Sequence, residues 1–252
     1  MIKITLPDGS TRNYVKPITI LDIAKDISEG LARNVISAKF NEKTVEVSTV
    51  IKNDGHLILY TWKDINGKKA FWHSSSHVLA QALQELYPGV KLTIGPAIEN
   101  GFYYDVDLGK NFISEKDLKN IEDRMLQIAR EKHDFKIRSV SKTEAIKKYS
   151  KEKNQYKIEL IENLIDEKIT FCDHSNFTDL CRGGHIPNTG IIKAVKLLNI
   201  AGAYWRGDEN NKQLTRIYGI SFPKQKELKE YLDIVEEAKK KRSQKTWQTI
   251  GA

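Results

Sequence analysis

The stretch "FWHSSSHVLAQAL", residues Phe71–Leu83, has the apolar spacing of an α-helix. From about His73 to Tyr87 apolar residues recur three and four positions apart, and the Pro88-Gly89 pair that follows ends the run. The apolar face of this predicted helix comprises Val78, Leu79, Ala82, Leu83 and Leu86. We therefore expect a helix that packs by this face against the remainder of the fold.

Two histidines lie on the other side of the same predicted helix. His73 and His77 are four residues apart, so their side chains project next to each other. They share this side with Ala80 and Gln84, so we do not expect them in the apolar core. Either they lie on an open surface, or they line a cleft for which the small Ala80 leaves room.

Residues 1–62 predict a small module of their own. "IKITLPDGSTRNY" alternates apolar and polar residues around a turn at Pro7–Gly9, and Thr19 is placed to cap a following helix. The strand-like runs "VISAKFN", "KTVEV" and "HLILYT" come next. This order of elements predicts a β-grasp, ubiquitin-like fold. The polar, turn-rich segment 63–69, "KDINGKK", is the expected domain boundary.

Residues 63–223 predict a larger domain of the α+β class with an antiparallel sheet. Its expected elements after the first helix are a hairpin around Glu99–Gly101, an amphipathic helix opened by Ser114, a helix with a capping box from Ser141 to Glu144, a helix in "YKIELIENLI", and a hairpin of "AYWRGD" and "QLTRIYGISF". A linker helix from about Lys224 to Arg242 follows, and a tail completes residues 224–252.

A second motif, "FTDLCRGGHIPNTG", occupies Phe177–Gly190. The Gly183-Gly184 pair breaks any helix and permits positive φ angles, so the motif is expected to be a loop. Cys181 and His185, with the two histidines of the first helix, could complete a tetrahedral zinc set, although the spacing differs from that of zinc fingers. Without a metal, the same residues could form a polar pocket that positions a water for attack on an ester. Alternatively, Cys181 is only a small buried side chain and His185 a surface residue.

Composition and charge narrow the class of protein. The chain of 252 residues has 41 basic and 33 acidic side chains, a net charge of +8 that suits either a polyanionic partner such as nucleic acid or simply a basic surface. No run approaches the roughly 18 apolar residues of a membrane span, and no signal peptide is recognisable. Two cysteines cannot form a disulfide framework, which indicates a reducing, cytoplasmic environment.

Five blocks, in order, resemble the N-terminal half of bacterial threonyl-tRNA synthetase: "HSSSHVLAQAL", "IGPAIENGFYYD", "KIELI", "FTDLCRGGHIPNTG" and "AGAYWRGDENNKQLTRIYG". The resemblance implies a TGS domain in residues 1–62 and an editing domain in residues 63–223. Alanyl-tRNA editing proteins have related histidine and cysteine pairs, but the TGS-like start and the "AYWRGD" hairpin favour the threonyl family. A complete synthetase continues into a catalytic domain that binds ATP and into an anticodon-binding domain. We therefore expect a fragment or free-standing editor that does not ligate threonine itself.

The resemblance also implies a reaction and a partner. Threonine and serine differ by one methyl group, which gives only about 1–3 kcal/mol of discrimination, so a second site must hydrolyse seryl-tRNA(Thr). The expected partner is the acceptor end of tRNA(Thr), together with the remaining synthetase domains and no membrane. The alternatives are a free-standing zinc hydrolase of mischarged alanine tRNA and a tRNA-binding module without catalysis.

Residue roles follow from the same resemblance. His73 is expected to activate water or handle the proton of the ribose hydroxyl, and Lys157 to orient water or stabilise the carbonyl oxygen. Neither is expected in the core. The expected substrate-binding residues are His77, Tyr104, Asp179, Cys181 and His185, with Tyr104 holding the terminal adenosine. No metal is expected because Lys157 supplies the positive charge; if zinc is bound, its ligands would be His73, His77, Cys181 and His185.

Overall fold

The N-terminal part of the chain is built around a five-stranded sheet in the order β2-β1-β7-β4-β5. The structure is a computed structural model that describes residues 1–165 and 168–250, with side chains up to residue 241. The strands are β1 (Ile2–Thr5), β2 (Thr11–Tyr14), β4 (Val35–Phe40), β5 (Lys43–Val45) and β7 (Gly55–Thr61), beside a two-stranded sheet of β3 (Ile18–Thr19) and β6 (Val50–Ile51).

Helix α1 (Ile20–Ile27) packs its buried Ile20, Ile23 and Ala24 on this part of the chain, and the short α2 (Glu29–Ala32) follows. Thr19 caps α1 as the sequence predicts, because its side chain accepts a hydrogen bond from the Asp22 N–H. Strands β1 and β7 pair in parallel at the centre of the sheet. The β-grasp fold expected from the sequence is confirmed.

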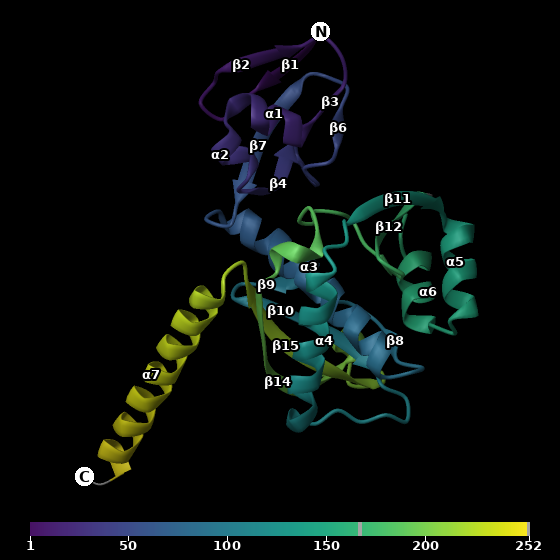
Figure 1. Ribbon diagram of the computed structural model, residues 1–252. Coiled ribbons are helices and arrows are strands. Elements are labelled where there is room, and N and C mark those ends of the chain that lie inside the picture. The colour runs from purple at the N-terminus through teal and green to yellow at the C-terminus, as the bar shows by residue number, and fades with distance from the viewer. Residues whose placement is uncertain (166–167, 251–252) are drawn as a thin grey trace.

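Helix α3 (Ile65–Leu86) leaves the N-terminal sheet and crosses the centre of the larger domain (Figure 1). Its C-terminal end agrees with the stop expected at Pro88-Gly89. Its start does not, because residues 65–69 of the segment 63–69, expected to be a turn-rich linker, form the first turn and more of the helix. The sequence pattern misses this because Gly67 is a poor helix former, whereas in the fold it passes against the backbone of Thr61, where a Cβ atom would lie 1.9 Å from the carbonyl oxygen.

The predicted apolar face of α3 is buried between a sheet and α4 (Leu118–Arg130), apart from Leu86, which is only partly buried. The antiparallel sheet has the order β14-β15-β10-β8, with β9 (Ala97–Ile98) also paired to β10. Its strands are β8 (Lys91–Leu92), β10 (Gly101–Asp107), β14 (Ala194–Tyr204) and β15 (Gln213–Phe222). Both predicted hairpins are present, and Ser114 forms a capping box with Asp117 at the turn (Glu115–Asp117) before α4.

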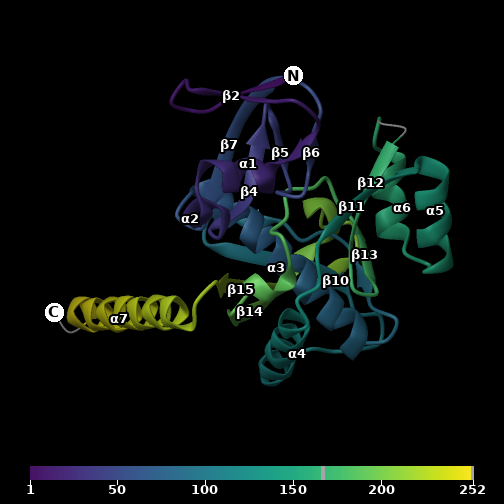
Figure 2. The same cartoon turned by 45° about the horizontal axis from the view of Figure 1, so that its top comes forward.

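A smaller lobe holds β11 (Lys136–Ser141), β12 (Lys168–His174) and β13 (Phe177–Leu180) with α5 (Lys142–Lys151) and α6 (Gln155–Glu162). It lies beside the end of α3, while α7 (Gln225–Ile250) projects away from the body of the molecule (Figures 1 and 2). Helix α7 extends beyond Arg242, where the sequence predicts an end, and residues 251–252 lie outside the described residues. No helix among the described residues is both long and apolar enough to cross a membrane.

The contact of Gly67 with Thr61 generates a stability prediction. Gly67→Ala places a methyl group 1.9 Å from the Thr61 carbonyl oxygen, so helix and strand must separate, at a cost of roughly 1–3 kcal/mol. Gly30→Ala is the matched control, because this exposed helical glycine has only the Ser28 hydroxyl at 3.4 Å. Thermal unfolding should show a lower midpoint for Gly67→Ala alone; equal midpoints would contradict the packing described.

Candidate active site

Three consecutive serines between the two histidines tie α3 to its surroundings. Ser74 accepts a hydrogen bond from the Ile186 N–H (3.0 Å), the Ser75 and Ser221 hydroxyls lie 2.7 Å apart, and the Ser76 hydroxyl donates to the Gly95 carbonyl (2.6 Å). Small side chains let these segments approach the helix closely. The histidines on either side are therefore surrounded by structure, and the cleft is the correct one of the two interpretations left open by the sequence.

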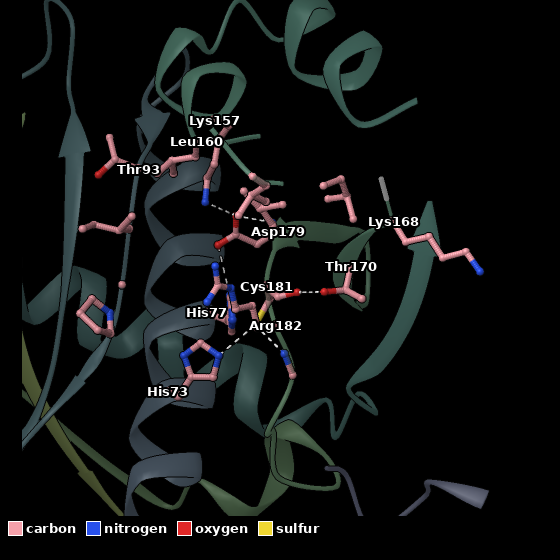
Figure 3. A pocket seen from close by; sticks show the side chains of 17 residues that line it. His73, His77, Thr93, Lys157, Leu160, Lys168, Thr170, Asp179, Cys181 and Arg182 are labelled. Carbon is pink, nitrogen blue, oxygen red and sulfur yellow. Dashed lines mark hydrogen bonds and ion pairs between the residues drawn. The ribbon is translucent and has the colours of Figure 1, made fainter. Parts of the chain in front are cut away.

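The two distant motifs meet at four side chains. Potential ligand atoms of His73, His77, Cys181 and His185 all lie within 4.8 Å of one another. His73 Nε2 is 3.0 Å from Cys181 Sγ (Figure 3). The same sulfur is 3.2 Å from His185 Nε2. The loop reaches this position with φ angles of +97° at Gly183 and +87° at the next glycine, as the Gly-Gly pair predicts. The structure thus brings together the residues that the sequence selects.

A cavity of about 670 Å³ opens in front of this cluster. His73, His77 and Cys181 line one part of it, and Lys157 and Asp179 another. Its remaining walls are the segment 93–96 and side chains of the small lobe, among them Leu160, Leu164, Ile169 and Thr170. Two exposed cationic residues, Lys168 and Arg182, lie at its edge. His185, which is completely buried, lies behind Cys181 rather than on the wall.

Asp179 is the centre of a second set of contacts within the cavity. Its Oδ1 is 2.5 Å from Lys157 Nζ, and its Oδ2 accepts a hydrogen bond from the Tyr104 hydroxyl at 2.6 Å. His77 Nδ1 lies 3.2 Å from the same Oδ2, within ion-pair range but not aligned as a hydrogen bond. Burial raises the pKa of Asp179, but Lys157 and His77 outweigh it, so the net pKa is lowered and the group stays a carboxylate.

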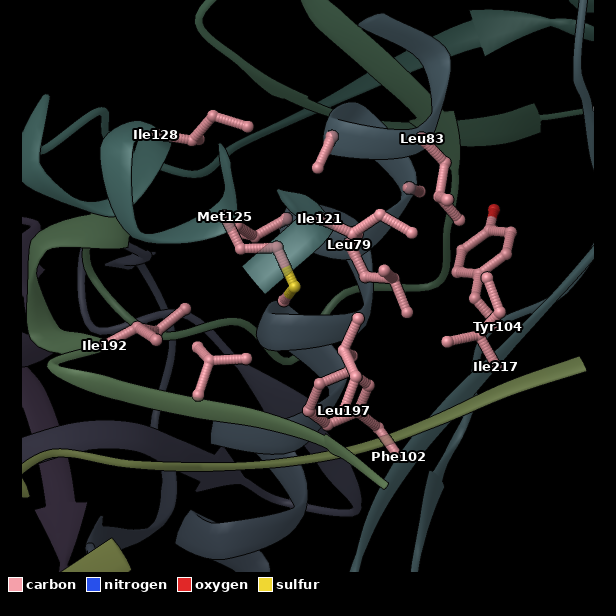
Figure 4. Close-up of a cluster of buried hydrophobic side chains, with 14 of the residues drawn as sticks. Leu79, Leu83, Phe102, Tyr104, Ile121, Met125, Ile128, Ile192, Leu197 and Ile217 are labelled. Carbon is pink, nitrogen blue, oxygen red and sulfur yellow. The ribbon is translucent and has the colours of Figure 1, made fainter. Parts of the chain in front are cut away.

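Two expectations from the sequence need correction. Lys157 was expected outside the core, but it is only 2% exposed, because α6 turns it inward onto Asp179. Tyr104 is 1% exposed, with its ring in the apolar core that includes Leu83 and Ile217 (Figure 4). The buried ring leaves no face for an adenosine, and the Tyr104 hydroxyl donates a hydrogen bond to Asp179 instead.

The pKa values of the four clustered side chains are shifted in different directions. Burial raises the pKa of Cys181, but the three histidines outweigh this and hold it well below the usual value. Burial lowers the pKa of His77 and His185, but Cys181 together with the carboxylates of Asp179 and Glu46 outweighs it, so the pKa of His185 is raised and that of His77 reaches about 9. For His73 burial dominates and the pKa is lowered. These directions favour the ionised form of Cys181, the protonated forms of His77 and His185 and the neutral form of His73.

The cluster also fits a metal ion. Three imidazoles and one thiolate are donors that Zn²⁺ prefers, and their spacing suits a tetrahedral set. Two rings are backed by carboxylates, His77 by Asp179 and His185 by Glu46, an arrangement common behind metal ligands. His77 Nε2 is buried and has no hydrogen-bond partner among the described residues. The N–S distances of 3.0 and 3.2 Å are equally those of hydrogen bonds.

One residue in contact with the site, Glu46, was not among those selected from the sequence. Glu46 belongs to the N-terminal domain, and its carboxylate accepts a hydrogen bond from His185 Nδ1 at 2.9 Å. The partners are 139 residues apart, and a single glutamate in a strand-like run carries no local signal. Only the packing of one domain on the other reveals it.

Comparison with known proteins identifies the two domains. Residues 2–61 match the TGS domain family, and residues 169–218 match the family described as the threonyl and alanyl tRNA synthetase second additional domain. The second match contains Asp179, Cys181 and His185 of the site. The fold and the site thus define a protein that combines a TGS domain with a tRNA synthetase-associated domain.

The relatives make the assignment narrower. The chain is 66% identical to a threonine–tRNA ligase of Flavobacterium psychrophilum, 68% to one of Flavobacterium johnsoniae and 57% to one of Cytophaga hutchinsonii, over 241 residues in each case. These matches cover 96% of this chain and 37% of each relative. The chain therefore matches the part of these threonine–tRNA ligases that carries the TGS and second additional domains, as the sequence resemblance implies.

The buried pair of Lys157 and Asp179 generates a second prediction. Lys157→Ala removes the cation and leaves a buried carboxylate short of its main partner, which costs about 3–5 kcal/mol. Lys168→Ala, at the exposed edge of the same cavity, is the control and should change the free energy of unfolding by less than about 0.5 kcal/mol. Urea unfolding at pH 7 compares the two. Equal stabilities would show that the ion pair is not formed.

Proposed function

We propose that the cavity hydrolyses the ester of mischarged seryl-tRNA(Thr). The observation that carries this proposal is the convergence of His73, Cys181 and Lys157 on one cavity in a chain that matches part of threonine–tRNA ligases. A base, a cation and room for a small aminoacyl group are what the reaction requires. The basic balance of 41 to 33 charged residues suits tRNA as the partner.

His73 is the proposed general base. It stays neutral because burial lowers its pKa. A hydrogen on Nε2 is donated to the Cys181 thiolate 3.0 Å away, which leaves a lone pair on Nδ1. That lone pair takes a proton from water, or from the ribose hydroxyl, as the water oxygen attacks the ester carbonyl. Cys181 thereby fixes the tautomer of His73 and need not act as the nucleophile.

Lys157 and His77 supply positive charge for the developing oxyanion. A lysine ammonium has three N–H donors; one points to Asp179 at 2.5 Å and another to the Tyr104 oxygen at 3.4 Å. The third is available to a carbonyl oxygen or a water in the cavity. His77, with its pKa raised to about 9, adds a second cation to the lining of the same cavity. His185 and Asp179 hold these groups in place from behind.

In this proposal the residues of the chain suffice without a metal. Zinc held by His73, His77, Cys181 and His185 would polarise the ester or lower the pKa of a bound water, and it would make the cation of Lys157 redundant. The fit of the four donors favours, as a second candidate, a zinc hydrolase that acts on mischarged alanine tRNA. A tRNA-binding module without catalysis leaves the base and the cation without a role.

The proposal extends to the partners and the location. We infer that the tRNA acceptor end enters the cavity past Lys168 and Arg182. The relatives are about 2.7 times as long as the matched part, since it covers 37% of each. In a full-length protein of this family the remaining domains would bind ATP and threonine and ligate the amino acid. A cytoplasmic location is part of the same proposal, since both cysteines are free.

The catalytic prediction concerns His73. His73→Ala should slow the release of serine from seryl-tRNA(Thr) by roughly 100-fold or more, because the general base is lost. His56→Ala, an exposed histidine of the N-terminal domain, is the matched control and should retain the wild-type rate. Lys157→Ala should slow release to a similar extent, with the loss of stability described above. Wild-type rates in His73→Ala would refute the assigned role.

A companion assay separates the candidate substrates. Wild-type protein is incubated with seryl-tRNA(Thr), threonyl-tRNA(Thr) and seryl-tRNA(Ala). The proposal expects fast deacylation of the first alone. Deacylation only of the alanine tRNA would favour the second candidate, and no deacylation of any would leave a binding module.

The metal prediction has its own measurement. Protein purified without chelator should contain well below one zinc per chain by elemental analysis, and serine release should survive EDTA. Cys181→Ser, which alters one candidate ligand, serves as the reference for the zinc content of a disrupted site. Stoichiometric zinc that is absent from Cys181→Ser would overturn the metal-free proposal.

A further inference from the structure

Glu46 lies on the N-terminal domain, directly after β5, and reaches the loop of the second motif. Its Oε1 receives three donors from that loop: the Gly184 N–H at 2.8 Å, the His185 N–H at 3.2 Å and His185 Nδ1 at 2.9 Å. The Glu46 side chain is 12% exposed and that of His185 is completely buried. This set of contacts joins one carboxylate oxygen to both the backbone and the ring of a residue in the site.

The contact with Glu46 determines that one particular ring nitrogen of His185 carries a hydrogen. An ionised carboxylate only accepts hydrogen bonds, so Nδ1 of His185 must carry the hydrogen that lies between them. The other ring nitrogen, Nε2, then faces Cys181 Sγ at 3.2 Å, and the sulfur faces His73 at 3.0 Å. A continuous chain of contacts therefore runs from the N-terminal domain through His185 and Cys181 to the proposed base.

The surrounding packing holds Glu46 in position. The Cα of Gly184 approaches Thr44, whose Cγ2 would lie 3.1 Å from an added Cβ, so the segment 44–46 rests directly on the loop. Ile36 of β4 is part of the hydrophobic core of the larger domain, and Trp62 packs against Phe71 and Trp72 of α3. The two domains share a core at this boundary, so the carboxylate approaches the loop from a fixed direction.

We propose that Glu46 is a positioning residue of the hydrolytic site, and that the TGS domain thereby forms part of that site. The inference rests on the proposed function. In this role the carboxylate sets the orientation of the His185 ring and the path of the glycine loop, and so places Cys181 against His73. Glu46 does not itself touch the aminoacyl ester.

The test compares Glu46→Gln with Glu42→Gln in the full chain. Glu42 directly precedes β5, at the other end of this strand from Glu46, and its exposed carboxylate forms an ion pair with Lys39 at 3.0 Å. Glutamine keeps the size of the Glu46 side chain but loses the charge and presents an amide that can donate. Serine release from seryl-tRNA(Thr) should fall roughly 10- to 100-fold in kcat for Glu46→Gln, with KM within about 2-fold, whereas Glu42→Gln should match wild type.

A second readout does not depend on activity. Ring-nitrogen NMR of wild-type protein labelled with ¹⁵N-histidine should show a hydrogen bonded to Nδ1 of His185, and the Nδ1 signal should move in Glu46→Gln but not in Glu42→Gln. A wild-type spectrum with no hydrogen on Nδ1 would overturn the proposal even if Glu46→Gln fails to fold. His185→Phe identifies the His185 signals by their loss.

The outcomes separate this inference from the function on which it rests. Active wild type with equal kcat in Glu46→Gln and Glu42→Gln refutes the role of Glu46 and leaves the hydrolytic function intact. A fall in kcat together with the shifted Nδ1 signal supports it. A wild-type chain that releases no serine removes the hydrolytic function, and the positioning role is then refuted with it.

Discussion

The close approach of α3 to the loop after Cys181 is the contact on which the rest of the site depends. It is possible because the residues between His73 and His77 are serines, whose side chains are short and can form hydrogen bonds. Ser74 accepts the Ile186 N–H and thereby satisfies a buried backbone donor that would otherwise be costly. Larger side chains at these positions would move the helix away from the loop, and the histidines would no longer reach Cys181.

This approach creates a buried polar centre, and its charges must be balanced. Taking a single charge out of water is expensive, so the carboxylate of Asp179 is paired with Lys157, and the sulfur of Cys181 lies among three imidazoles. Such networks contribute little to net stability, because well-packed apolar side chains of similar volume would stabilise the core equally well. Their value here is in orientation, because each charged group restricts where its neighbours can lie and which nitrogen carries a hydrogen.

The two domains are therefore connected by more than a covalent link. Only residues 62–64 separate the last strand of the N-terminal sheet, which ends at Thr61, from helix α3, which begins at Ile65. Ile36 extends the larger core into the N-terminal domain, and Glu46 contributes an acceptor to the loop of the second motif. A movement of one domain relative to the other would change the surroundings of His185. The geometry of the site therefore depends on how the two domains pack.

The sequence by itself determined the elements and the chemistry of the site. Periodic apolar residues define α3 and α4, the turn signals define the hairpins, and His73, His77, Cys181 and His185 stand out because their motifs are rare in a chain with two cysteines and six histidines. These features depend only on residues that are close together in the sequence. The tertiary structure alone decided three things. It placed residues 65–69 in α3, buried Lys157 on Asp179, and brought Glu46 to His185. Each depends on a partner distant in sequence, and local pattern contains no information about which distant group will compensate a buried charge or accept a buried N–H.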